Sequence, residues 1–110
     1  MEVILIKLRA LAAQFPEGFT VFVPEVQIVK SGWVVAKKET QNSFGEAGLQ
    51  KALEVALKTS KAMGGWKDEK LFYWDAVEIY EDEETATQAG FRNEQQAIYQ
   101  IETGRLKWLK

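Results

Sequence analysis

The 110-residue sequence contains no cysteine and no histidine. Without cysteine the chain can form neither disulfides nor thiolate metal sites, and a thiolate nucleophile is excluded. Without histidine it lacks the most common metal ligand and the only side chain whose ordinary pKa lies near neutrality. Any acid or base catalyst would have to be a carboxylate, a lysine or a tyrosine with a shifted pKa. We therefore assign no catalytic, cofactor-binding or metal-binding residue and expect no cofactor.

The low content of proline and glycine, the balanced charge and the lack of a long apolar run disfavour several other classes of protein. Two prolines and eight glycines leave no room for a long flexible linker. Basic and acidic residues are mixed along the chain and the net charge is -2, so a broad phosphate-binding stripe is not expected. The opening run MEVILIKLRALAAQF is too short and too often interrupted by charge for a membrane span, and it lacks the unbroken apolar core of a signal peptide. We expect a cytoplasmic protein without a membrane partner.

Apolar residues are abundant, at 46% of the chain, and they include four Trp, three Tyr and six Phe. This content is enough to bury one core and argues against disorder. The sequence has no internal repeat, no low-complexity tract and no shift in composition that would mark a boundary. We therefore predict a single α+β domain over residues 1–110.

Two segments in the first half of the chain have the spacing of amphipathic helices. Residues 2–14 place Ile4 and Leu8 on one face, although the run 3–6 would also suit a strand. Residues 44–60 give the clearest pattern, with an apolar stripe that includes Leu53.

A third helix is expected within EDEETATQAGFRNE, residues 81–94. Asp82 is a plausible N-cap, and the glutamates that follow it suit the positive end of the helix dipole. Ala86, Ala89 and Phe91 are expected to face inward.

Alternating apolar residues predict β-hairpins in the remaining segments. In FTVFVPEVQIVKSGWVVAKKE, an arm interrupted at Pro24 would turn at KSG and pair with residues 33–39. Residues 63–66 and 71–80 form a second predicted hairpin. Both faces of residues 71–80 are largely apolar, which favours a central strand.

The chain ends in a third predicted hairpin, QAIYQIETGRLKWL, with its turn at ETGR. The elements then follow the order α-β-β-α-β-β-α-β-β. No strand-helix-strand unit is rich in glycine, so an antiparallel sheet of about five or six strands, packed with two or three helices, is favoured over a doubly wound fold.

The segment ETQNSFGEAGL leads into the second helix and contains the first candidate site. Ser43 and Glu46 have the spacing of a capping box, which would start the helix. The polar residues before them could bind an anion at the positive helix terminus, since backbone amides point outward there. The simpler interpretation is that these polar residues satisfy the bend. The candidate contacts in this segment are Glu39, Thr40, Gln41 and Asn42.

Asp75 lies in the apolar strand FYWDAV and is the second candidate. A buried carboxyl needs partners or a raised pKa, which marks functional sites in some proteins. Pairing with a nearby lysine, or with a loop amide, is the simpler explanation. Together with Glu39 or Glu78, Asp75 would imitate the two carboxylates of a hydrolase.

Trp66, in the sequence GGW, is the third candidate. With Tyr73 and Trp74 nearby, it would form an aromatic platform for a base, a sugar or a peptide. The alternative is that these rings only pack in the core, as most aromatic residues in a small chain do.

A resemblance to a known family rests on four segments in this order: FPEGFTV, SGWVVAKKETQNSFGEAGL, GGWKDEKLFYWDAVEIYED and NEQQAIYQIETG. The chain resembles a family of small uncharacterised proteins from Bacteroides and its relatives, which are often encoded near mobile or phage-like elements. The segments ETQNSFG and GGW, with the aromatic strand that follows, are the most specific. The resemblance implies an organism group and a single-domain fold, and no mechanism.

These features favour a non-catalytic binding module that contacts another protein. An exposed edge strand at 19–23 or 105–109 would accept a partner strand or pair with its own copy. A nucleic-acid-associated accessory protein of a mobile element is the alternative, with local contacts from Lys30, Lys37, Lys38 and Lys107. A carboxylate-dependent hydrolase that uses Asp75 and Glu39 is a weaker alternative.

Overall fold

The computed structural model describes residues 2–110. Its elements are α1 (Glu2–Gln14), β1 (Phe19–Phe22), β2 (Gln27–Ile28), β3 (Trp33–Ala36), the 3-10 turn η1 (Lys38–Thr40), α2 (Gly45–Lys58), β4 (Ala62–Asp68), β5 (Leu71–Tyr80), α3 (Glu83–Arg92), β6 (Ala97–Gln100) and β7 (Arg105–Trp108). The radius of gyration is 12.8 Å, close to the value of about 13 Å for a compact domain of this size.

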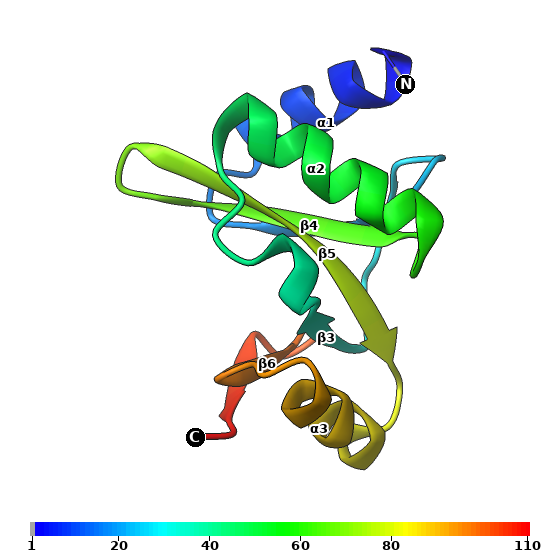
Figure 1. The fold of residues 1–110 in the computed structure, drawn as a ribbon, viewed down its shortest axis with the longest axis vertical. Helices are drawn as coiled ribbons and strands as arrows, with labels where there is room; N and C mark the ends of the chain where they lie inside the picture. The colour runs from blue at the N-terminus through cyan, green and yellow to red at the C-terminus, as the bar shows by residue number, and fades with distance from the viewer. Residues whose placement is uncertain (1) are drawn as a thin grey trace.

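The strands that lie within residues 2–110 form one antiparallel sheet of seven strands, in the spatial order β2-β1-β4-β5-β3-β6-β7 (Figure 1). The α+β class is therefore confirmed, with one strand more than the upper prediction. β5 is the central strand, as predicted, and pairs with β4 on one side and β3 on the other. The predicted β4–β5 and β6–β7 hairpins are also confirmed.

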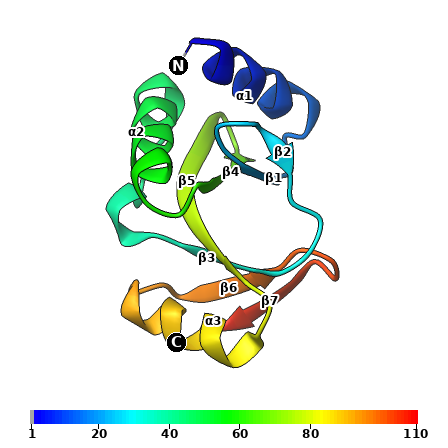
Figure 2. The same ribbon diagram turned by 90° about the vertical axis from the view of Figure 1, so that its right-hand side faces the viewer.

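The sheet twists so strongly that its two ends carry separate helices (Figure 2). We call α1, α2, β1, β2 and β4 the α1–α2 half, and α3, β3, β6 and β7 the α3 half. β5 runs through both. Trp74 and Ala76 of β5 enter the core under α1 and α2, and Tyr80 packs against the core under α3. Because alternate residues of a strand share a face, Tyr73 and Asp75 point to the opposite side, which we call the second face of β5.

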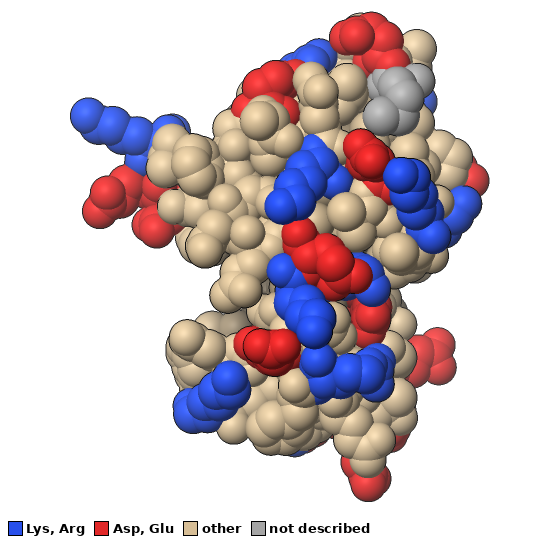
Figure 3. Space-filling model, viewed as in Figure 1, with Lys and Arg blue, Asp and Glu red and all other residues tan. Residues whose placement is uncertain are grey.

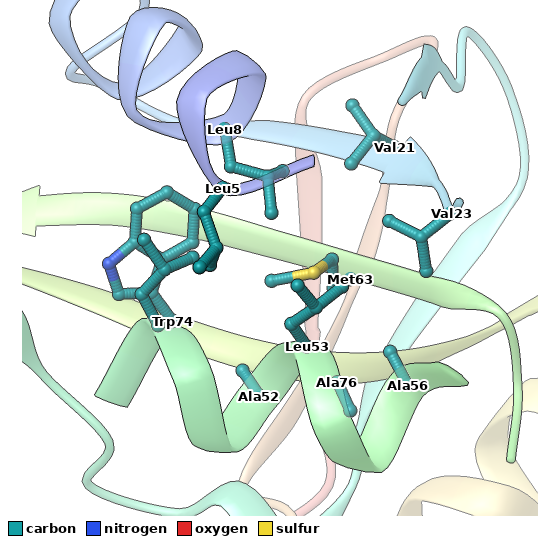
Figure 4. Packing of buried hydrophobic residues seen from close by; sticks show 11 residues of the cluster. Leu5, Leu8, Val21, Val23, Ala52, Leu53, Ala56, Met63, Trp74 and Ala76 are labelled. Atoms are coloured by element: carbon teal, nitrogen blue, oxygen red, sulfur yellow. The ribbon is translucent and has the colours of Figure 1, made fainter. Parts of the chain in front are cut away.

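The core of the α1–α2 half contains residues at helical spacing, and Figure 4 shows how its buried side chains pack. Leu5 and Leu8 of α1 meet Leu49 and Leu53 of α2 over β4 and β5. β4 can pass this closely because a Cβ on Gly65 would collide with the Phe72 ring.

The core of the α3 half is smaller and consists of Trp33, Val35, Ala86, Ala89 and Ile98. Gly90 is a poor helix former, but a Cβ at this position would collide with Leu109. The glycine therefore allows α3 to lie close to the sheet.

The predicted hairpin between residues 19–28 and 33–39 is wrong. The chain turns earlier, around Pro24, and β2 pairs with β1. β3 instead crosses to the other half of the sheet, where it pairs with β5 and β6. The cause is long-range, because Trp33 and Val35 are buried against α3.

The predicted capping box is also wrong. α2 begins at Gly45, its N-cap is Phe44, and no side chain caps it. The Ser43 carbonyl instead accepts from the backbone N–H of Trp74 at 2.8 Å, which ties the chain to the edge of β5. Glu46 forms an ion pair with Arg9 of α1.

The α3 prediction is confirmed at its start, where the Asp82 carboxylate accepts from the backbone N–H of Thr85 at 2.8 Å. Ala86 and Ala89 face inward as predicted. Phe91 does not, since it is 54% exposed. Gly90 occupies the inward position instead, and the next residue is turned about 100° further round the helix. Within residues 2–110 no helix is both long enough and apolar enough to cross a bilayer.

Candidate functional site

A cleft of about 430 Å³ lies between the β4–β5 hairpin and the α3 half. In Figure 3 the outline of the molecule is indented on the left, between these two parts. The cleft is lined by Ala36, Lys37, Gln41, Asn42, Trp66, Asp68, Tyr73, Asp75 and Gln95.

The cleft brings together four of the six predicted contact residues. Gln41 and Asn42 come from the segment between β3 and α2, whereas Trp66 and Asp75 come from the β4–β5 hairpin. These two pieces are far apart in the sequence and were predicted as separate candidates. The antiparallel sheet joins them at one place.

The register of the β4–β5 hairpin explains the aromatic wall of the cleft. Trp66 lies directly opposite Tyr73, and their rings stack with centroids 5.1 Å apart at an angle of 22°. Phe44 meets Tyr73 edge-on, with centroids 5.9 Å apart. Trp66 remains 45% exposed, so its ring is accessible to a ligand.

Asp75 lies next to this wall on the second face of β5. Burial raises the pKa of its carboxyl to about 6, because removal of water disfavours the charged form. The structure shows no hydrogen bond or ion pair to this carboxyl from residues 2–110. The lysine of the cleft, Lys37, bonds to Glu78 at 3.1 Å instead. The simpler explanation for Asp75, a lysine or loop-amide partner, is therefore not what the structure contains.

The residue opposite Asp75 on β4 is Gly64, which has no side chain. A Cβ there would lie 2.7 Å from the carbonyl oxygen of Phe19, so the approach of β1 requires glycine. As a result, the residue directly opposite on β4 has no side chain that could cover or pair with the Asp75 carboxyl.

Thr40 is fully buried and has a structural role. Its hydroxyl accepts from the backbone N–H of Ala76 at 3.0 Å and donates to the Lys37 carbonyl at 3.3 Å. At η1 the chain moves away from β5. The Thr40 hydroxyl therefore accepts the bond from Ala76 that a backbone carbonyl of a neighbouring strand would otherwise accept. Thr40 thereby fixes the segment that carries Gln41 and Asn42, the latter in a left-handed conformation with φ of 61°.

Glu39 does not line the cleft. It is exposed, and its carboxylate lies 4.0 Å from the Lys37 ammonium. Glu78 is on the other face of β5, where it accepts from the Tyr80 hydroxyl at 2.7 Å. Neither carboxylate shares the cleft with Asp75, so the predicted two-carboxylate arrangement has no support from the geometry.

Asp68 and Gln95 were not predicted as contacts. Asp68 lies two residues beyond Trp66 on the same strand, so a known strand register would have placed it on the same face. Gln95 lies between α3 and β6, and its side-chain amide donates to the Asn93 carbonyl at 3.1 Å. No local pattern signals its place in the cleft, which depends on the packing of the α3 half.

A second accessible surface lies at the end of the sheet. β7 pairs with β6 on one side and has no strand within residues 2–110 on the other, so the predicted edge strand at 105–109 is confirmed over Arg105–Trp108. The predicted edge at 19–23 is wrong, because β1 lies between β2 and β4. Leu106 is 51% exposed and Trp108 is 66% exposed, and they share one face with Tyr99 of β6.

The predicted basic residues are largely neutralised by neighbours. Lys37 pairs with Glu78, Lys38 with Glu94 and Lys107 with Glu83. On the face in Figure 3, blue and red side chains alternate instead of forming a stripe of one sign. Trp74 belongs to the core and cannot stack on a base. The nucleic-acid alternative stays a prediction.

No protein-family model, curated protein or solved structure matches the chain at a significant level. The resemblance to the Bacteroides proteins therefore stays a prediction as well.

Proposed function

We propose that the protein is a non-catalytic binding module that recognises a segment of another protein in the cleft. The observation that carries the proposal is the accessible Trp66–Tyr73 stack beside an Asp75 carboxyl that has no partner among residues 2–110. A polar group removed from water without a partner is costly, and a bound ligand would offset this cost. Rigid aromatic rings supply contact area at a low cost in side-chain entropy, which explains their enrichment at interfaces.

The size of the cleft supports recognition of a short segment. Its volume of about 430 Å³ is at the lower end of the range for ligand sites, roughly 300–1,000 Å³. It suits one or two side chains, and neighbouring surface would contribute the rest of an interface.

The spacing of the cleft carboxylates argues against a hydrolase. Asp75 is level with Gly64 on β4, and Asp68 lies further along the same strand. At ~3.3 Å per residue, the two positions are about 13 Å apart along the strands. The paired carboxylates of glycoside hydrolases are separated by roughly 5–9.5 Å.

A pull-down from a lysate of the native host tests the proposal. The wild-type chain is compared with Trp66→Ala, and Trp108→Ala serves as a matched control that removes an exposed indole elsewhere. We expect a protein that the wild type and the control both retain and that Trp66→Ala loses. Circular dichroism checks that each variant is folded. If every retained protein survives the Trp66→Ala change, the cleft is not the binding site and the proposal fails.

Self-association through β7 is a second candidate, favoured by the exposed Leu106 and Trp108 on an edge strand. If the β7 strands of two copies pair antiparallel with Leu106 at the centre, Leu106 of one copy lies opposite Leu106 of the other. This pairing also sets Trp108 against Gly104 of the second copy, where the indole meets no side chain. The positive charges of Arg105 and Lys107 would not oppose this pairing strongly, because both pair with Glu83.

Sedimentation velocity over a concentration series tests the second candidate. We expect a monomer–dimer equilibrium that Leu106→Lys abolishes. Leu71→Lys, which changes an exposed leucine at the tip of the β4–β5 hairpin, is expected to leave the equilibrium intact. A wild-type chain that stays monomeric at every concentration rules out the candidate.

A further inference from the structure

We infer that the cleft binds a basic side chain of the partner protein, and that the guanidinium group of arginine fits it best. This inference rests on the proposed function and specifies the chemistry of the ligand. Three features of the cleft lead to it, namely its charge, its aromatic wall and the acceptors around its rim.

The charge of the cleft is negative. Asp68 and Asp75 both line it, and the lysine that lines it is already engaged outside the cleft. The Lys37 ammonium lies 3.1 Å from the Glu78 carboxylate and 4.0 Å from that of Glu39. Lys37 therefore does not satisfy Asp75, and a cation supplied by a ligand would.

The aromatic wall suits a flat cation. Trp66 lies two residues along β4 from Gly64, the residue opposite Asp75, so the indole and the carboxyl are diagonal neighbours on one face. A guanidinium can lie against the accessible indole face, where the electron density of the ring attracts positive charge. The same group can direct its N–H fork at the neighbouring carboxylate. The bare backbone of Gly64 keeps the approach to that carboxylate clear of side chains.

The rim supplies acceptors for the remaining donors of a guanidinium, which has five N–H groups. Gln41 and Asn42 line the cleft, and the side-chain amide of each carries an oxygen that can accept. Gln95 uses its amide nitrogen to bond to the Asn93 carbonyl, which leaves its Oε1 oxygen as an acceptor. Lysine has only three donors and no flat face, so it should bind the same site more weakly.

A sugar would also use aromatic, amide and carboxyl groups, but it would leave the charge of Asp75 without a counterion. An anionic ligand would meet the repulsion of both aspartates. A cation is the one class that removes the unfavourable feature of the site, which is a carboxylate partly withdrawn from water without a partner.

Binding should weaken in acid. The charged and polar groups that line the cleft with Asp75 include Tyr73 on its own strand, Trp66 and Asp68 on β4, Lys37 after β3 and Gln95 before β6. Asp75 is the group in this set whose pKa is raised into the neutral range, to about 6. Lowering the pH from 7.5 to 5 protonates it and removes the charge that holds the cation.

The test uses acetyl-Gly-Arg-Gly-amide as the probe and the same peptide with citrulline as its neutral, equally shaped control. Binding to the wild-type chain is followed by NMR through the indole N–H signal of Trp66 and the backbone signals of residues 73 and 75. We expect the arginine peptide to shift these signals, the citrulline peptide to leave them unchanged, and the affinity to fall several-fold, by up to about tenfold, at pH 5. Asp75→Asn should cause a similar loss at pH 7.5.

The possible failures separate the two proposals. If the arginine and citrulline peptides shift Trp66 equally, the ligand class is wrong although the cleft still binds. If neither peptide shifts these signals, the inference of a basic ligand is overturned, and the Trp66→Ala pull-down decides independently whether the cleft is a binding site. Asp75→Asn should fold at least as well as the wild type, because it removes a buried charge, so lost binding in this variant cannot be assigned to unfolding.

Discussion

The two halves of the molecule are built around the same strand but are stabilised very differently. The α1–α2 half buries large side chains from two helices, among them Leu8, Leu53, Met63 and Trp74. The α3 half is covered by a single helix whose buried positions are alanine and glycine. Because the free energy gained on burial scales with apolar area, the α1–α2 half should hold most of the stability. The cleft lies between them, so its walls should differ in rigidity.

The largest effect should come from Leu53→Ala, which removes a fully buried side chain in the α1–α2 half. We expect the free energy of unfolding to fall by about 2–5 kcal/mol, measured in urea, because the deletion leaves a cavity. Ile98→Ala in the α3 half removes a similar volume. In that variant, hydrogen exchange should speed up mainly in α3, β6 and β7. Equal acceleration throughout the sheet would mean that the two halves open as one unit.

Asp75→Asn should stabilise the protein at pH 7.5. The folded-state pKa of about 6 exceeds the ordinary value of 3.8, so the folded state binds more protons between pH 4 and 6 and loses stability as the pH rises through this range. The shift corresponds to up to about 3 kcal/mol at full ionisation. We expect the difference between variant and wild type in urea unfolding to be large at pH 7.5 and small at pH 4. A difference that does not depend on pH would mean that the carboxyl keeps its ordinary pKa in the folded state.

Thr40→Val tests the connection between the cleft segment and β5. The substitution keeps the shape but removes the acceptor for the buried N–H of Ala76, so it should cost about 1–3 kcal/mol. Thr40→Ser retains the hydroxyl and should lose much less. If thermal unfolding shows no loss for Thr40→Val but a loss for Thr40→Ser, the methyl group matters and the hydrogen bond does not.

The smallest effect should follow Asp82→Ala, which removes the N-cap of α3. We expect faster hydrogen exchange confined to α3, with little change in the α1–α2 half. Asp68→Ala, which changes an exposed aspartate outside any helix cap, is the control. Exchange that speeds up equally in α2 would contradict the separation of the two halves.

The sequence predicted the parts of the fold that depend on local patterns. Helical spacing located α1, α2 and α3, and alternation located the β4–β5 and β6–β7 hairpins. It failed at Trp33, whose partners lie in distant segments. The prediction is also one strand short, because the single arm expected over residues 19–28 is two paired strands, β1 and β2. Ser43 and Glu46 matched a capping pattern, but a tertiary bond to β5 and an ion pair to α1 took precedence.

In the candidate site, too, local patterns identified single residues but not their arrangement in space. Trp66, Asp75, Gln41 and Asn42 could be chosen because polar or aromatic residues stood out against their local patterns. That they meet in one cleft could not be predicted, because it depends on the register of β4 with β5 and on the path of the chain after β3. Gln95 has no local signal, since only the docking of the α3 half brings it there.

The crossing of β3 has a consequence for how the chain is made. Trp33 finds its neighbours in Tyr80 and Gln100, both of which leave the ribosome long after it does. The apolar run WVVA must therefore remain without its strand neighbours while α2, β4 and β5 are synthesised, and during this interval it is open to wrong association. A chaperone that holds nascent chains would be expected to act on this stretch.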